Sequence, residues 1–155
     1  MKWTSQDVEM YSQAKEYIDT ALVPLIPIAM GGDMEQSASM TEYISLLASQ
    51  LERQFTGRLI LLPAFTYMES EHTDDVASRL NRWEESLAGE GFKHIFLLTS
   101  DENWRLKEEG IGGSLIWMPL LPLAGMEEQQ KVMLINGQIK QLMKFFTAKW
   151  NQEGN

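Results

Sequence analysis

The sequence contains no cysteine among its 155 residues and only two histidines, His72 and His94. The absence of cysteine excludes disulfides, thiolate nucleophiles, cysteine-ligated zinc and iron–sulfur clusters, and it fits a reducing compartment. Two histidines leave few possible members for a catalytic triad or a multi-histidine metal site. His94 precedes an apolar run, at the end opposite the expected ligand crevice. His72 is therefore the only histidine that we consider as a catalyst.

Long apolar runs and an excess of positive charge are also missing. No apolar run approaches the roughly 18 residues of a membrane span, and residues 1–7 lack the apolar region of a signal peptide. Thirteen Lys and Arg against 22 Asp and Glu give a net charge of −9, which repels nucleic-acid phosphates and anionic lipid surfaces. We therefore expect a cytoplasmic protein that binds neither nucleic acid nor membranes.

The sequence does contain four short, continuously apolar runs separated by segments of helical periodicity. They are Leu22–Ala29, Leu59–Phe65, Ile95–Leu98 and Leu115–Leu121. Such runs are typical of buried parallel strands, which need helical crossovers. The pattern predicts an α/β fold: a three-layer α/β/α sandwich, flavodoxin-like or Rossmann-like, with four mainly parallel strands in the order 2-1-3-4. We expect one domain over residues 1–150 and a frayed tail over residues 151–155.

Pro24 and Pro27 lie within the first apolar run. Neither can donate a ladder hydrogen bond, and successive residues of a parallel strand direct their amides to opposite neighbours. Two prolines three residues apart therefore cannot both face one free edge. We expect Pro24 at the start of the strand and Leu25–Met30 as its paired part.

Capping residues indicate where the helices begin. Thr4 is expected to cap the first helix, a capping box of Ser39 and Glu42 the second, and Thr73 the third. The last helix is predicted over roughly residues 126–150. Its apolar face is predicted to consist of Val132, Ile135, Ile139, Leu142, Met143, Phe146 and Trp150.

The richest polar stretch, residues 69–75, follows the second predicted strand. Glu69, Glu71 and His72, together with Asp101 after the third strand, could hold a divalent metal. His72 and Asp101 are also the candidate catalytic residues. The interpretation that we favour assigns this stretch to helix capping and to the helix dipole, with no metal and no cofactor.

Two further loops could hold a ligand. Ser100 and Arg105 follow the third strand, where Arg105 could bind a carboxylate or phosphate through two hydrogen bonds, although capping of a short helix explains them almost as well. Gly31 and Gly32 follow the first strand and could bring backbone amides to a phosphate. The adjacent Asp33 and the absence of dinucleotide-binding or P-loop spacing favour a simple turn.

These residues favour a regulatory module that binds a small molecule or a protein partner. No nucleophile, base and orienting group can be assembled from them. The alternative is a divalent-metal-dependent hydrolase with its site at the carboxyl ends of strands 2 and 3.

The last helix carries more apolar residues than one face can cover, because Phe145 adjoins Phe146 and Met133 adjoins Leu134. We expect the surplus to be exposed and to contact a second copy or a protein partner, on this helix or on the neighbouring residues 120–123. The alternative is that the first and last helices cover each other.

Three stretches carry a resemblance to a known family. They are Met1-Lys2-Trp3, residues 11–28 with Ala14-Lys15-Glu16-Tyr17-Ile18-Asp19-Thr20-Ala21 and Pro24, and residues 91–104. With these, the chain resembles the YpiF-like proteins of spore-forming Gram-positive bacteria over nearly its full length. That family is uncharacterised, so the resemblance implies a cytoplasmic bacterial protein and assigns no catalytic residue.

Overall fold

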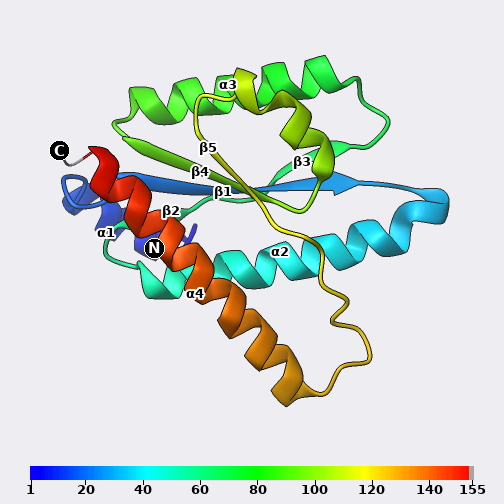
Figure 1. Ribbon diagram of the computed structural model, residues 1–155. Helices are drawn as coiled ribbons and strands as arrows, with labels where there is room; N and C mark the ends of the chain where they lie inside the picture. The colour runs from blue at the N-terminus through cyan, green and yellow to red at the C-terminus, as the bar shows by residue number, and fades with distance from the viewer. Residues whose placement is uncertain (154–155) are drawn as a thin grey trace.

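The computed structural model describes residues 1–153, which alternate between helices and strands (Figure 1). In chain order the elements are α1 (Ser5–Gln13), β1 (Thr20–Ile28), the 3-10 turn η1 (Gly31–Asp33), α2 (Met34–Gln54), β2 (Leu59–Leu61), β3 (Phe65–Met68), α3 (Thr73–Gly89), β4 (His94–Thr99), the 3-10 helix η2 (Glu102–Gly110), β5 (Ser114–Trp117) and α4 (Glu128–Glu153).

The strands form one parallel sheet in the order β2-β1-β4-β5, and β3 pairs with β1 on the same side as β2. The predicted order 2-1-3-4 is confirmed. The single strand predicted over Leu59–Phe65 is wrong, because this segment contributes β2 and the first residue of β3, with residues 62–64 between them. Pro63 lies in that interruption, where its missing N–H removes no ladder bond.

Both prolines of β1 lie inside the strand, so the prediction that β1 starts at Pro24 is wrong. The Leu22 carbonyl accepts from the Leu62 amide at 3.0 Å and the Ile28 carbonyl from the Glu69 amide at 2.8 Å, so even-numbered residues face β2 and β3. By this alternation Pro24 faces the interruption between those strands. Pro27 faces the other side, beyond the last β1–β4 pair at Pro24. Each proline nitrogen, which has no N–H to donate, therefore faces a position where the neighbouring strand forms no ladder with β1.

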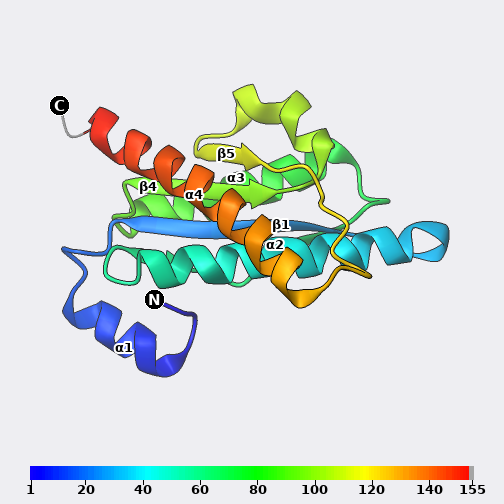
Figure 2. The ribbon, with the colours of Figure 1, turned by 60° about the horizontal axis from the view of Figure 1, so that its bottom comes forward.

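The helices form layers on the two faces of the sheet, which confirms the three-layer α/β/α prediction (Figures 1 and 2). α2 and α4 cover one face, where their apolar stripes bury Leu22 and Phe96 of the sheet. α3 and η2 cover the other face, where Val76 and Trp104 pack against Leu97. Alternate side chains of each strand therefore enter two separate cores.

Two of the three predicted helix starts are wrong in position, whereas Thr4 caps α1 by accepting from the Asp7 amide at 3.1 Å. α2 begins at Met34, five residues before Ser39, because η1 has already turned the chain at Gly31, whose φ is +73°. The cap of α3 is His72 in place of Thr73, and its Nδ1 accepts from the Asp74 amide at 3.3 Å.

α4 begins at Glu128 and continues to Glu153, through the first three residues of the segment expected as a tail. Residues 154 and 155 of that expected tail lie outside the described residues. The predicted apolar face is buried or partly buried except at Val132, which is 53% exposed. α4 packs against α2, whereas α1 lies apart from α4 (Figure 2). Within residues 1–153, no helix combines the length and apolar character needed to cross a membrane.

A buried carboxylate joins α3 to the start of β5. Glu84 Oε2 accepts from the Gly113 amide at 2.5 Å, while Oε1 has no hydrogen-bond partner within the described chain. A Cβ at Gly113 would lie 2.6 Å from the Ile95 carbonyl oxygen, so only glycine fits this close approach. Burial raises the pKa of the Glu84 carboxyl, because desolvation disfavours the charged form more than the backbone amides favour it.

This raised pKa predicts how Glu84→Gln changes stability with pH. The folded protein holds the Glu84 proton more tightly than the unfolded chain does. Wild-type stability contributed by this residue is therefore fully present below the unfolded pKa and falls as the pH rises toward the folded pKa. Glutamine does not titrate, so we expect the unfolding free energy of the variant, relative to wild type, to increase from pH 4 to pH 7. Urea unfolding at both pH values measures this difference, and a constant difference would contradict the assignment.

Candidate functional site

The carboxyl edge of the sheet has a crevice where the chain leaves β1 and β4 toward opposite faces. β1 leads through η1 into α2 on one face, whereas β4 leads into η2 on the other. The crevice between these exits has a volume of about 310 Å³. Gln36, Ser37 and Asn103 are among its polar lining residues, and its charged lining residues are Asp33, Glu69, Asp101 and Glu102. Ligands of open α/β sheets bind at such positions.

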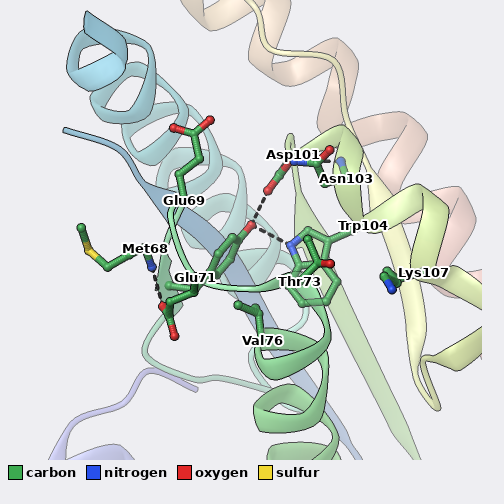
Figure 3. A pocket seen from close by; sticks show the side chains of 10 residues that line it. Met68, Glu69, Glu71, Thr73, Val76, Asp101, Asn103, Trp104 and Lys107 are labelled. Carbon is green, nitrogen blue, oxygen red and sulfur yellow. Dashed lines mark hydrogen bonds between the residues drawn. The ribbon is translucent and has the colours of Figure 1, made fainter. Parts of the chain in front are cut away.

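A smaller cavity of about 50 Å³ adjoins the crevice (Figure 3). One set of its lining residues comes from the end of β3 and the start of α3, and the other comes from the segment after β4. Glu69, Asp101 and Asn103 line both hollows. Lys107 also lines the smaller cavity, but its ammonium group bonds the Asp74 carboxylate at 2.7 Å.

The Tyr67 phenol connects the end of β3 to the segment after β4. Dashed lines in Figure 3 mark its bonds to Asp101 and Trp104. Its hydroxyl donates to Asp101 Oδ2 at 2.6 Å and accepts from Trp104 Nε1 at 2.7 Å. Burial, together with the Asp101 carboxylate, raises the pKa of Tyr67 far above its ordinary value, so the phenol stays protonated and continues to donate. The other carboxylate oxygen of Asp101 accepts from the Asn103 amide at 3.0 Å. Asp101 is therefore held on both sides, and its bond from the Asn103 backbone amide is the N-cap of η2.

Three of the four residues considered as metal ligands, Glu71, His72 and Asp101, have other partners. Glu71 accepts from the Met68 amide at 2.7 Å and pairs with Arg79 at 3.1 Å. His72 caps α3 with a side chain that is 70% exposed. Glu69 and Asp101 line the crevice, but no three His, Asp or Glu side chains in residues 1–153 are grouped to hold one ion.

The two residues considered as ligand-binding candidates after β4 both contact β5. The Arg105 guanidinium lies 4.7 Å from the centre of the Trp117 ring. The Ser100 carbonyl accepts from Trp117 Nε1 at 3.1 Å, and its buried hydroxyl makes no hydrogen bond within the described chain. Neither side chain lines the crevice or the smaller cavity.

Gly31 and Gly32 also lie outside both hollows. Gly31 adopts the left-handed conformation that η1 requires. Gly32 lines a separate groove beside α2. The loop therefore positions α2, and its one carboxylate, Asp33, lines the crevice that a phosphate would have to enter.

Sequence reasoning missed Tyr67, which holds the crevice residue Asp101, and did not foresee the contacts that Ser37 makes at the crevice. Tyr67 lies on β3, whose only local signal is the alternation of buried and exposed residues over 65–68. The Ser37 hydroxyl accepts from the Ala29 amide at 3.2 Å and donates to the Pro27 carbonyl at 2.8 Å. The Ser37 hydroxyl thereby satisfies these two backbone groups of the β1 end, which lie beyond the last pair of the β1–β4 ladder.

A family model described as "Protein of unknown function (DUF2487)" matches residues 9–150. The chain belongs to this family. It is also 34% identical over 151 residues to the "Uncharacterized protein YpiF" of Bacillus subtilis (strain 168), a match that covers 97% of this chain and 99% of that protein. The resemblance to YpiF-like proteins is thus confirmed. No solved structure matches the chain.

Proposed function

We propose that this protein is a small-molecule-binding regulatory module whose site is the 310 Å³ crevice between the exits of β1 and β4. The observation that carries the proposal is the position of the crevice. Neighbouring parallel strands whose connections leave to opposite faces create a hollow that no helix can fill. The absence of an assembled nucleophile and base among its lining residues supports a binding role over catalysis.

The lining indicates the chemistry of the ligand. All four charged lining residues are carboxylates, and Asp101 is fixed by the Tyr67 hydroxyl and the Asn103 amide. Oriented carboxylates favour a ligand that carries an ammonium group or several hydrogen-bond donors, and they disfavour phosphates and carboxylic acids. Buried Met40 and the Pro27 ring add apolar surface for the body of such a ligand.

The test compares small diamines and polyamines with dicarboxylic acids of matching length. Thermal unfolding and amide NMR shifts of the ¹⁵N-labelled protein are measured with each compound. An amine at one hundred times its dissociation constant should add about 2.7 kcal/mol of stability. It should also shift the amides of residues 29–37 and 99–103, whereas the acids should do neither.

Variants on α2 show whether binding occurs in the crevice. Gln36→Arg places a guanidinium among the lining carboxylates and should abolish the amine response, whereas Gln54→Arg at the exposed far end of the helix should retain it. An amine response that survives Gln36→Arg would contradict the proposed site. A shift with a divalent metal ion alone that disappears in His72→Ala would instead support the metal-dependent hydrolase.

A further inference from the structure

A second groove, of about 610 Å³, runs between the first half of α2 and the segment that joins β5 to α4. This connecting segment passes beside α2 before it turns into α4 (Figures 1 and 2). The groove adjoins the crevice, with which it shares Asp33 and Gln36. Most of its lining lies farther along α2 and on residues 120–124.

The two walls differ in chemistry. The α2 wall carries Glu35, Ser39 and Glu42, whose spacing of four and three residues places them on one helix face. Glu35 and Glu42 are separated along that face by about 10.5 Å, which is seven residues at 1.5 Å each. Asp33, Glu35 and Glu42 are the charged lining residues of the groove, so all the charge on this wall is negative.

The opposite wall is apolar. Leu120, Leu121 and Leu123 are partly buried and pack against the core between the sheet and α2. Pro122 and Ala124 are exposed beside them. The leucines therefore hold this segment in place while it presents apolar surface to the groove.

We propose that this groove docks an amphipathic helix of a protein partner that carries Lys or Arg along one edge and apolar side chains along its face. Basic residues seven apart on such a helix repeat at the same 10.5 Å or so as Glu35 and Glu42. The adjoining apolar face then covers the leucine wall, as in other helix-in-groove complexes. Charge selects this occupant over a second copy, because two chains of net charge −9 repel each other.

The test uses a fluorescein-labelled peptide of about 18 residues, long enough to form a helix, with Leu on one face and Lys at seven-residue intervals along its edge. Fluorescence anisotropy follows its binding to the full chain. We expect saturable binding that weakens with salt. A peptide with Glu in place of Lys should not bind, and one with Gln in place of Leu should bind at least tenfold more weakly.

Matched charge reversals separate the groove from the general acidity of the protein. Glu35→Lys with Glu42→Lys should weaken binding at least tenfold. Asp75→Lys with Glu85→Lys makes the same change of net charge on α3, again at one first-turn and one later position, and should alter binding less than threefold.

Equal loss in both double variants, or equal binding of the Gln-substituted peptide, would overturn the proposal. Sedimentation of the wild type distinguishes a partner protein from a second copy of this chain. A monomeric wild type supports a foreign partner, whereas a dimer that dissociates with Glu35→Lys and Glu42→Lys would show that a second copy occupies the groove and would overturn the assigned occupant.

Discussion

Replacing Phe146 with alanine is expected to lower the free energy of unfolding by about 3–5 kcal/mol, the range for truncating a buried aromatic side chain. Phe146 of α4 is fully buried and stacks on Phe96 of β4 with ring centres 4.1 Å apart. Phe55 and Trp150 also contact the Phe146 ring. The substitution would leave a cavity where α2, α4 and the sheet meet, and close packing allows little collapse there.

Guanidinium unfolding measures this loss, and two variants of the same helix serve as controls. Met133 is 75% exposed, so Met133→Ala should change the unfolding free energy by no more than about 0.5 kcal/mol. Phe145 is partly buried and lies 6.2 Å from the Phe96 ring centre, so Phe145→Ala should have an intermediate effect. If Phe145→Ala cost more than Phe146→Ala, the orientation of α4 described above would be wrong.

Tyr67→Phe is expected to cost about 1–3 kcal/mol, because it removes one oxygen and leaves one buried and one partly buried group without this partner. Those groups are Trp104 Nε1 and Asp101 Oδ2. The ring and its packing are retained, so the loss reports the hydrogen bonds. Because Asp101 would no longer be held from the β3 side, we also expect weaker amine binding in the crevice.

Tyr43→Phe is the matched control. Tyr43 of α2 is also buried, but its hydroxyl has no hydrogen-bond partner within the described chain, and burial raises its pKa to about 12. Removing that hydroxyl should leave stability unchanged or increase it. Urea unfolding of both variants compares the two phenols, and equal losses would contradict the special role assigned to Tyr67.

The strand order could be predicted because the four apolar runs are local, and parallel pairing with right-handed crossovers leaves few possible orders. The break between β2 and β3 could not, because residues 59–65 are apolar throughout. The positions of Pro24 and Pro27 within β1 were harder to predict, because a proline fits inside a strand only where the neighbouring ladder stops, and that depends on other strands. The predicted helix starts were wrong where several neighbouring residues could act as the cap. α2 begins before the predicted cap Ser39 because the chain already turns at Gly31, and His72 caps α3 in place of Thr73. The capping preference of a single residue therefore predicts a helix start poorly when tertiary contacts decide which of several adjacent residues is the cap.

The position of the candidate site was predictable, but its content was not. The carboxyl edge of the sheet follows from topology, and Asp101 and Glu69 were identified as polar residues at strand ends. The contacts of Tyr67 with Asp101 and Trp104 span 34 and 37 residues, so no short sequence pattern encodes them. The contact of Arg105 with the Trp117 ring was not predicted, because a guanidinium at a strand end can either bind an anion or stack on an aromatic ring.

The central place of β1 has a consequence for synthesis of the chain on the ribosome. β1 is complete at Ile28, but its neighbour β4 ends only at Thr99, 71 residues later. At about 5–20 residues per second, this apolar strand waits roughly 4–14 s for that partner. An unpaired apolar strand is a template for aggregation, and proline blocks such pairing by removing a donor. Pro24 and Pro27 face opposite sides of β1, so each side of the nascent strand lacks one donor that a non-native strand would need. The native ladders lose no hydrogen bond, because neither proline nitrogen faces a paired residue of a neighbouring strand.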